Sequence, residues 1–582
     1  MRSRKFHFSL PSGWVALGLV VAPDLDVAQG LARAADAPWI ARGAKGMVAT
    51  DSHYASQAGL EMLVAGGNAI DAATAVSFAL AVTRPYSTGL GGGGFMIARF
   101  ADGRVIVQDF RETAPAAATA DMYTRSPGGE SARPSPSEFG HLAVAVPGLV
   151  AGRCQALAQW GTMPLERVLA PAIRLARSGY AVDRDYVDRA RAVLRNYEAF
   201  PSLRESCGYV YRTHLRGGRA WEVGDTLVQP ALARLLEELA RSGPDAFYRG
   251  PIAQAVALEM KQHGGIITEQ DLENYRPRLR EPLVSTYRNY QLIAMPSPSS
   301  GGVALAETLN ILEALGLSEI AGREPGLAAH YQIEAMKHAF ADRAAFLGDQ
   351  DFIRAPIERL VSKSYAAALA RSIEPDRSGD LDRYGSMEMP KDAGTSHFCV
   401  VDRWGNLVVS SETINTEFGS LAAVEEWGLI LNNEMDDFST EPGRPNAFGL
   451  VPSDANTIAP GKRPLSSMCP TIVLKDDKPF LLLGASGGPR IISSVLNVFL
   501  GVVDLGLSLE AAIERPRPHH QWRPDKVFFD REPPVTIQSE LVRRGHPVVD
   551  ERRTAIVQAI LRVDDGWVAA SDPRKGGKPA AE

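Results

Sequence analysis

Two neighbouring segments near residue 400 alternate between apolar and polar side chains. They are residues 397–402 and 406–412, and a short stretch with a glycine, residues 403–405, separates them. This pattern predicts a β-hairpin with a tight turn. If the turn is centred on that stretch, Thr395 lies opposite Thr413, with Cβ atoms roughly 5 Å apart. A shift of one residue in the turn would give Thr395 a different partner.

Apolar periodicity elsewhere predicts helices interspersed with strands. Residues 69–82 are apolar nearly all round and follow Asn68, a good N-cap, so we expect a buried helix there. Residues 95–100 and 105–108 are predicted to form another hairpin, and residues 151–277 to be mainly helical. No linker or internal repeat divides the chain. The pattern therefore favours one α+β domain with four layers of helix and sheet.

The chemical interest of the first hairpin lies in Thr395. A threonine hydroxyl needs a base, and its own α-amine can serve when the threonine is the first residue of a chain. That amine has an ordinary pKa of roughly 7.7–8. Thr395 becomes N-terminal only if the bond after Gly394 is cut, and glycine would permit the strained backbone that such a cut needs. On the residues alone, a Gly-Thr pair at the head of a strand is ordinarily no more than the start of that strand.

Several motifs, in one consistent order, resemble the γ-glutamyltranspeptidase family. They are Gly394-Thr395-Ser396-His397, Asn415-Thr416-Glu417-Phe418-Gly419, Asn432-Asn433-Glu434-Met435-Asp436-Asp437, Lys462-Arg463-Pro464-Leu465-Ser466-Ser467-Met468 and Gly487-Gly488-Pro489-Arg490. The resemblance extends from about residue 46 to residue 574. It implies an N-terminal-nucleophile hydrolase fold, a four-layer αββα sandwich. It also implies a zymogen that cuts itself into a large subunit, residues 38–394, and a small subunit, residues 395–582, which stay together as a heterodimer in one catalytic domain.

The resemblance further implies an activity. The enzyme would cleave the γ-glutamyl amide of glutathione and related compounds through a γ-glutamyl-threonine ester. It would then pass the γ-glutamyl group to water or to an amino acid or dipeptide acceptor, without a cofactor. A γ-glutamyl group carries an α-carboxylate and an α-amine, so its pocket needs both signs of charge, and arginine suits the carboxylate in a bidentate pair.

By motif match, the resemblance assigns ten residues to this site. Thr395 would be the nucleophile, with Thr413 hydrogen-bonded to it. The other eight are Gly487 and Gly488, whose N–H groups would stabilise the oxyanion, Arg111, Ser466 and Ser467 for the α-carboxylate, and Asn415, Glu434 and Asp437 for the α-amino end. Without the resemblance, the acidic run at residues 434–437 is equally well a solvated turn.

Other interpretations remain open. Residues 484–488 fit the G-x-S-x-G pattern of serine hydrolases, with Ser486 as nucleophile; its candidate partners are His519, His520 and His546. Within the same family, a cephalosporin or glutaryl acylase is the alternative. A binding module with an unused pocket is the non-enzymatic one. The glycine run at residues 89–94 matches a dinucleotide motif, but it follows a helix and precedes a strand, which is the wrong context.

Composition narrows the classes of partner and ligand. The 582 residues are 45% hydrophobic and 22% charged, and the net charge of −6 argues against nucleic acid as a main partner. Four scattered cysteines are too few for a disulfide framework or a zinc site. His330, Glu334 and His338 lie on one predicted helical face, but the two histidines would be roughly 12 Å apart, too far to share an ion. No metal site is predicted.

The N-terminal segment resembles an export signal. A basic start precedes a short apolar run at residues 13–22, and Ala35-Asp36-Ala37 has the small-x-small form of a cleavage site. Asp24 and Asp26, soon after the apolar run, are atypical. We expect residues 1–37 to be a signal peptide or leader and the protein to be periplasmic or secreted. No run of 18 apolar residues occurs, so no membrane span is expected.

Overall fold

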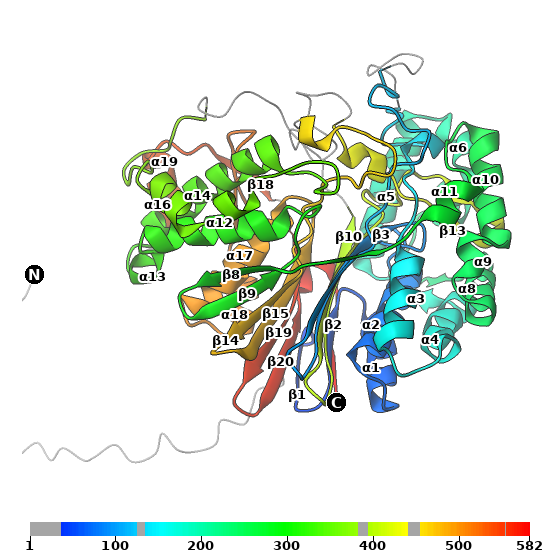
Figure 1. Cartoon of the computed structure of the whole chain (residues 1–582), viewed down its shortest axis with the longest axis horizontal. Coiled ribbons are helices and arrows are strands. Elements are labelled where there is room, and N and C mark those ends of the chain that lie inside the picture. The colour runs from blue at the N-terminus through cyan, green and yellow to red at the C-terminus, as the bar shows by residue number, and fades with distance from the viewer. Residues whose placement is uncertain (1–36, 125–133, 382–393, 440–453, 553–554) are drawn as a thin grey trace, which may run out of the picture. The chain divides into compact units, whose positions relative to one another are not determined.

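Two seven-stranded antiparallel sheets pack against each other at the centre of the protein (Figure 1). The computed structural model describes residues 37–124, 134–381, 394–439, 454–552 and 555–582, and residues 38–582 form one compact unit. The first sheet has the order β1 (Ile40–Gly43), β20 (Gly566–Ser571), β19 (Ile556–Val563), β15 (Lys478–Ser486), β14 (Thr471–Lys475), β9 (Tyr290–Ala294) and β8 (Leu283–Tyr287). The second has the order β21 (Ala580–Ala581), β2 (Met47–Thr50), β10 (Thr395–Val401), β11 (Leu407–Thr413), β3 (Gly93–Arg99), β4 (Val105–Asp109) and β7 (Arg278–Arg280).

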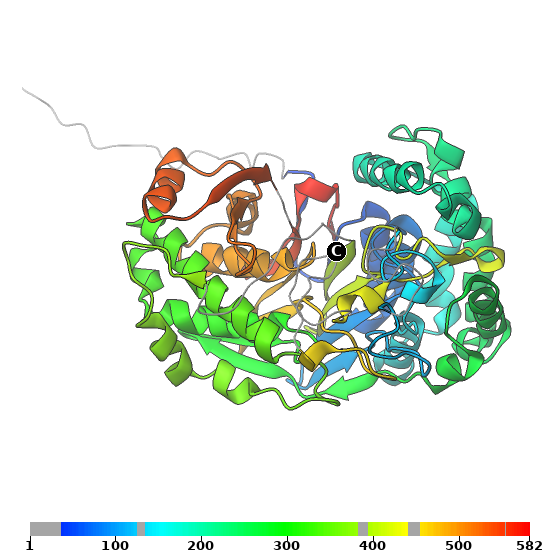
Figure 2. The ribbon, with the colours of Figure 1, turned by 90° about the horizontal axis from the view of Figure 1, so that it is seen from above.

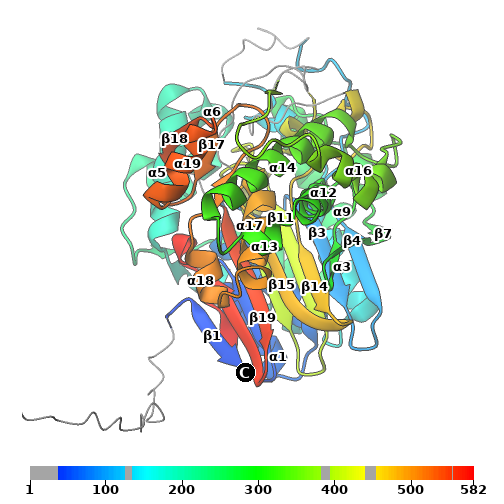
Figure 3. The same cartoon turned by 90° about the vertical axis from the view of Figure 1, so that its left-hand side faces the viewer.

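Helices cover the outer face of each sheet, so the predicted four-layer order is confirmed (Figure 2). Over the first sheet lie α12 (Gly301–Ala314), α14 (Pro325–Phe346), α16 (Lys363–Ala370), α17 (Arg490–Val503), α18 (Leu509–Glu514) and α19 (Val535–Arg543), seen in front of the strands in Figure 3. Beside the second lie α1 (His53–Val64), α2 (Ala69–Thr83), α3 (Leu149–Trp160), α4 (Leu165–Ser178), α5 (Arg184–Ala199), α8 (Pro230–Ser242) and α10 (Pro251–His263). Shorter helices are α6 (Leu203–Ser206), α7 (Gly208–Thr213), α9 (Asp245–Tyr248), α11 (Glu269–Asn274), α13 (Leu317–Ile320) and α15 (Ile357–Leu360).

Helix α2 shows how local sequence and burial agree. The Asn68 side chain accepts hydrogen bonds from the backbone N–H groups of Ile70 and Asp71, and the Asp71 carboxylate accepts one from Asn68 N. This capping box satisfies N–H groups that would otherwise lack partners. Every residue of the helix is buried, as its all-round apolar pattern predicted, and it packs on β10 and β11.

The hairpin of β10 and β11 has the predicted register. Thr395 pairs with Thr413, and the pairing continues to Val401 and Leu407 before the turn. On its other side β10 pairs with β2, and β11 pairs with β3. Thr395 therefore begins a central strand of the second sheet, and all seven residues of β10 are buried.

Glycines allow the closest approaches around this hairpin. A Cβ on Gly92 would lie 2.0 Å from the carbonyl oxygen of Thr413, so the glycine run at residues 89–94 packs against the end of β11. The interpretation of this run as close backbone packing is confirmed. Gly484 on β15 lies against the imidazole of His397, where a Cβ would be 2.2 Å from a ring carbon, which lets the two sheets meet.

Candidate active site

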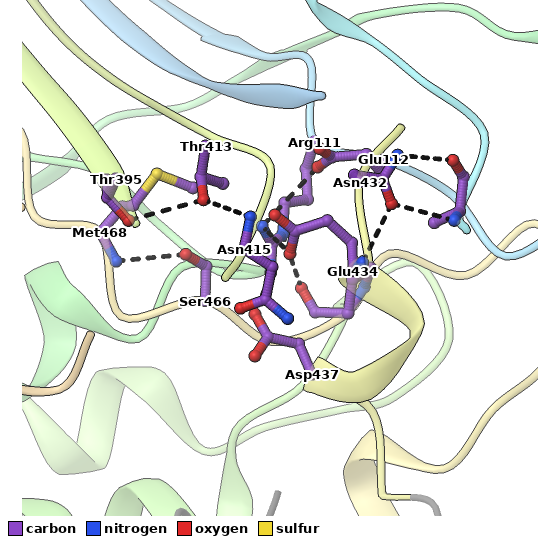
Figure 4. A network of polar contacts seen from close by, with 12 residues as sticks. Arg111, Glu112, Thr395, Thr413, Asn415, Asn432, Glu434, Asp437, Ser466 and Met468 are labelled. Atoms are coloured by element: carbon purple, nitrogen blue, oxygen red, sulfur yellow. Dashed lines mark hydrogen bonds and ion pairs between the residues drawn. The ribbon is translucent and has the colours of Figure 1, made fainter. Parts of the chain in front are cut away.

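The Thr395 hydroxyl lies at the head of β10, next to the hydroxyl of Thr413 (Figure 4). The Thr395 hydroxyl donates to Thr413 Oγ1 over 3.5 Å, and the backbone N–H of Asn415 donates to the same oxygen over 2.7 Å. The Thr413 hydroxyl donates its own proton to the carbonyl oxygen of Gly394 over 2.9 Å. A hydroxyl has one proton and two lone pairs, and Thr413 uses all three. The predicted contact between Thr413 and the nucleophile is therefore present.

Gly394 has a packing constraint that the sequence did not indicate. A Cβ at this position would lie 2.4 Å from the carbonyl oxygen of Tyr86 and 3.0 Å from the Cα of Ser87. Gly394 thus lies too close to neighbouring backbone for any side chain. Its φ lies outside the left-handed region, and the strained geometry expected for the cut stays a prediction.

One pocket brings together eight of the ten predicted residues. Its lining includes Arg111, Thr395, Thr413, Asn415, Asp437, Ser466, Ser467 and Gly488, together with Leu465, Met468 and Ile491. Of the two others, Glu434 contacts Arg111, and Gly487 directly precedes Gly488. Segments from five parts of the chain converge here, and Thr395 lies among them.

Arg111 is the centre of a buried cluster of charges. It lies just after β4, where its backbone N–H donates to Asp109, and its side chain is 1% exposed. Nη1 lies 2.6 Å from Glu434 Oε2, Nη2 bonds to Asp437 Oδ2, and Nε donates to the carbonyl oxygen of Pro464 over 3.3 Å. The guanidinium is thus held by two carboxylates of one 3-10 helix, η6 (Glu434–Asp437).

Burial shifts the pKa values of these acids. It raises the pKa of Glu112 to about 8 and that of Glu434 well above its usual range, while Arg111 lowers both. Burial also raises the pKa of Asp437, again against the effect of Arg111. Burial lowers the pKa of Arg343 to about 10. Taking charges out of water disfavours their charged forms, so burial opposes ionisation of these acids and pairing with Arg111 favours it.

The other polar residues that line this pocket are held in place by hydrogen bonds to backbone and side chains. Ser466 Oγ accepts from the N–H of Met468 over 3.1 Å, and Ser467 Oγ accepts from Arg343 over 3.3 Å. Asn415 has a φ of 76°, in the left-handed region that asparagine tolerates, and its amide donates to Asn433 O over 2.9 Å. Asn415 Oδ1 is buried with no hydrogen-bond partner among the described residues, so an acceptor remains for a ligand.

Gly487 and Gly488 form the turn between β15 and α17. Their φ values of 135° and 58° lie where glycine is strongly favoured. Helix α17 begins two residues later, at Arg490. The helix dipole leaves partial positive charge at this end, beside the pocket that Gly488 lines. The turn is therefore suited to stabilise negative charge on a reacting oxygen.

Ser486 has the strand–turn–helix context of a nucleophile elbow but not its partners. It ends β15, where it pairs with Ile556, and it does not line the pocket around Thr395. The candidate histidines bond elsewhere: His519 to Ser493 over 2.9 Å, and His546 to His330 over 2.7 Å. The geometry favours threonine over serine chemistry.

Sequence reasoning missed charged residues that only the fold brings to this site. Glu112, next to Arg111 in the chain, is fully buried with its carboxylate 3.6 Å from the guanidinium. Arg343 reaches Ser467 from α14, far away in the sequence. The adjacency of Glu112 to Arg111 was a readable signal, whereas nothing local marked Arg343.

Two clusters among the described residues have the side chains to hold a metal ion. They are His141, Glu259 and His263, and His330, Glu334 and His546. In the second cluster, the Lys337 ammonium already forms an ion pair with the Glu334 carboxylate, with 2.7 Å between Nζ and Oε1. Neither cluster contributes a residue to the pocket around Thr395. Within the described residues, no helix is long and apolar enough to cross a membrane.

Comparisons with known proteins agree with this geometry. The family model for γ-glutamyltranspeptidase matches residues 55–582. The chain is 42% identical over 538 residues to a glutathione hydrolase proenzyme of Escherichia coli, covering 92% of this chain and 91% of that one. It is 38% identical to an acylase ACY 1 proenzyme of a Pseudomonas species, covering 93% and 94%. The crystal structure of a cephalosporin acylase from Bacillus halodurans matches with a TM-score of 0.80 and 29% identity, covering 93% and 97%. The N-terminal-nucleophile hydrolase fold is thus confirmed, and the chain belongs to the γ-glutamyltranspeptidase family.

Proposed function

We propose that this protein cleaves the γ-glutamyl amide bond of glutathione and related compounds with Thr395 as nucleophile. The observation that carries the proposal is the pocket itself, in which the hydroxyl of Thr395 shares one lining with Arg111 and Asp437. A γ-glutamyl group has one positive and one negative charge at its α-carbon. The pocket offers a matching charge for each, a short distance from a nucleophile.

Substrate binding would replace the ion pair between Arg111 and Asp437 with two ion pairs, one from each residue to the substrate. In the structure Asp437 bonds to Arg111. A substrate α-carboxylate that takes the guanidinium of Arg111 releases Asp437, which can then accept from the substrate α-amine. Charge-assisted bonds of this kind contribute about 1.5–3 kcal/mol each. Ser466 and Ser467 add hydroxyl donors on the carboxylate side, and the free Oδ1 of Asn415 adds an acceptor for the amine.

The chemical step follows from the groups around Thr395. Its α-amine takes the hydroxyl proton as Oγ1 attacks the γ-carbonyl carbon, and the turn at Gly487 and Gly488 stabilises the oxyanion. Collapse of this intermediate breaks the amide bond, and the amine product leaves with the proton. Water, or the amine of an amino acid or dipeptide, then attacks the γ-glutamyl-threonine ester and regenerates the hydroxyl.

The same hydroxyls suit the maturation that creates this amine. Oγ1 of Thr395 would attack the Gly394 carbonyl carbon, and the Thr413 hydroxyl already donates to that carbonyl oxygen. The acyl group passes from nitrogen to oxygen, which breaks the C–N bond and frees the α-amine. Water then hydrolyses the ester, which releases Gly394 as a carboxylate and regenerates the Thr395 hydroxyl. Once the carbonyl has left, the proton of Thr413 is available to Thr395 Oγ1. Residues 38–394 and 395–582 would then form a heterodimer.

We further propose that the protein is exported. The proposal rests on the basic and apolar N-terminal pattern, and residues 1–36 lie outside the described residues. Expression in a Gram-negative host and N-terminal sequencing of the large fragment test it. A periplasmic fragment that starts near residue 38 supports export, whereas a cytoplasmic fragment that starts at Met1 contradicts it.

The glutaryl acylase alternative is kept because acylases are among the relatives. A glutaryl group lacks the α-amine, so it leaves the Asp437 side of the pocket without a partner, and unsatisfied buried groups cost about 1–3 kcal/mol. The test compares kcat/KM for γ-glutamyl and glutaryl p-nitroanilides on the processed enzyme. We expect a γ-glutamyl preference of at least about tenfold. Equal values or a glutaryl preference would move the protein to the acylase activity.

A further inference from the structure

A buried ion pair lies next to Thr395, outside the lining of the substrate pocket. Lys575 Nζ lies 2.6 Å from Asp51 Oδ2, and their side chains are 4% and 1% exposed. Asp51 directly follows β2, and Lys575 ends the 3-10 helix η8 (Pro573–Lys575). Neither residue lines the substrate pocket, so substrate recognition does not account for the pair.

The pair holds both residues that begin β10. Lys575 Nζ donates to the carbonyl oxygen of Thr395 over 3.1 Å and to Ser87 Oγ over 3.0 Å. Asp51 Oδ2 accepts from the hydroxyl of Ser396 over 3.0 Å. An ammonium has three N–H donors, and all three of Lys575 are used. The first strand residue is thus fixed through its backbone, which leaves its hydroxyl free for chemistry.

The ammonium is also close to the nitrogen that becomes the base. Three covalent bonds separate the oxygen and nitrogen of one residue, so Nζ lies within about 7 Å of Thr395 N. A nearby positive charge disfavours protonation of an amine, and a buried site strengthens that effect. An α-amine acts as a base only when it is neutral.

We propose that Lys575 is a positioning residue that holds Thr395 by its carbonyl oxygen and keeps the freed α-amine neutral. The inference rests on the proposed function, because it concerns the amine that maturation exposes. Lys575 acts through Thr395 and does not touch the substrate.

Other charges near Thr395 stay constant in the test. Arg111 and Asp437 line the pocket on the substrate side. Around the ion pair, Arg84 Nε donates to the backbone carbonyl of Asp51 over 2.9 Å, and the centre of the Tyr86 ring lies 5.7 Å from Lys575 Nζ. Lys575→Met therefore removes a positive charge and leaves the Asp51 carboxylate unpaired, and both changes favour protonation of the α-amine.

The test is the pH dependence of kcat/KM for γ-glutamyl p-nitroanilide on processed enzyme. The acid limb of this profile reports the pKa of the free enzyme's base. For Lys575→Met we expect the limb to move to higher pH by about one unit, with roughly tenfold less activity below the limb and near-normal activity on the high-pH plateau. Lys575→Arg keeps the charge and should restore the wild-type limb. The matched control Lys578→Met removes an exposed lysine of the same segment and should leave the profile unchanged.

An unmoved limb, or a loss of activity that is equal at every pH, would overturn the inference. If Lys575→Met stays uncut, Lys575→Gln takes its place, because glutamine keeps a donor for Thr395 and removes only the charge. An uncut Lys575→Gln chain would also contradict the inference, since a donor alone should hold Thr395. Failure of the proposed function looks different: the wild-type protein would then be uncut, or would not cleave γ-glutamyl p-nitroanilide.

Discussion

At the scale of single residues, Asp437 decides whether the pocket distinguishes γ-glutamyl from glutaryl groups. Asp437→Asn removes the negative charge that would pair with the substrate α-amine. We expect kcat/KM for γ-glutamyl p-nitroanilide to fall by about 10- to 150-fold, the equivalent of about 1.5–3 kcal/mol, with little change for the glutaryl analogue. Asp436→Asn is the matched control, because Asp436 accepts from Ser137 over 2.6 Å and does not line the pocket. Equal losses on both substrates would contradict this role.

Glu112 gives the stability of the protein a pH dependence. Burial raises the pKa of its carboxyl to about 8, against about 4.5 in the unfolded chain. The folded protein therefore keeps this proton between pH 4.5 and 8 while the unfolded chain loses it, so the contribution of Glu112 to stability falls as pH rises through this window. Glu112→Gln removes the titration.

Between pH 5 and pH 8, we expect the free energy of unfolding of Glu112→Gln to rise relative to that of the wild type by on the order of 2 kcal/mol. Thermal unfolding of both processed proteins at the two pH values measures it. The Tm of the variant minus that of the wild type should be larger at pH 8 than at pH 5. A difference that is the same at both pH values would show that Glu112 does not titrate in this window.

The sequence was enough to predict many of the residues at the site, but it did not reveal all the buried charged residues around them. The motifs marked Arg111 and Asp437, and the structure places both beside Thr395. Arg343, Asp51 and Lys575 were missed because each approaches from a distant part of the chain. The close backbone packing at Gly394 was also missed, since such packing cannot be read from a local pattern.

At the scale of elements, the hairpin of β10 and β11 positions Thr395, and Gly394 allows the start of β10 to pack against the backbone of Tyr86 and Ser87. Gly394→Ala would force a Cβ to within 2.4 Å of the Tyr86 carbonyl oxygen. We expect this variant to process at least about tenfold more slowly, because backbone atoms here cannot move without displacing Thr395. Gly322→Ala is the control, since nothing lies within 4 Å of that position and its φ is ordinary. Equal processing rates on denaturing gels would contradict the role of close packing.

The register of β10 with β11 was predictable because a three-residue turn fixes it. The neighbours β2 and β3 were not, since they come from residues more than 290 positions earlier in the chain. Pairing between such distant segments depends on the whole fold and leaves no local signal. For the same reason the capped helix α2 was predictable, whereas its packing against the hairpin was not.

At the scale of the whole molecule, both sheets interleave strands from the two sides of Gly394. In the second sheet, β10 and β11 lie between β2 and β3, and the first sheet places β1 beside β20. Cutting the bond before Thr395 therefore leaves two fragments that share both sheets and their cores. We expect the fragments to elute together in size-exclusion chromatography and to separate only in denaturant. Separate elution of the fragments under native conditions would contradict this arrangement.

The position of the cut tests the central claim most directly. Intact-mass measurement and Edman sequencing of the active, purified protein should find a fragment of residues 395–582, which is 188 residues and about 20 kDa of the 62.7 kDa chain, with Thr395 as its first residue. Thr395→Ala should remain a single chain without activity, because it lacks the attacking hydroxyl. An active single chain, or an active protein cut at another bond, would contradict the account of Thr395 as an N-terminal nucleophile.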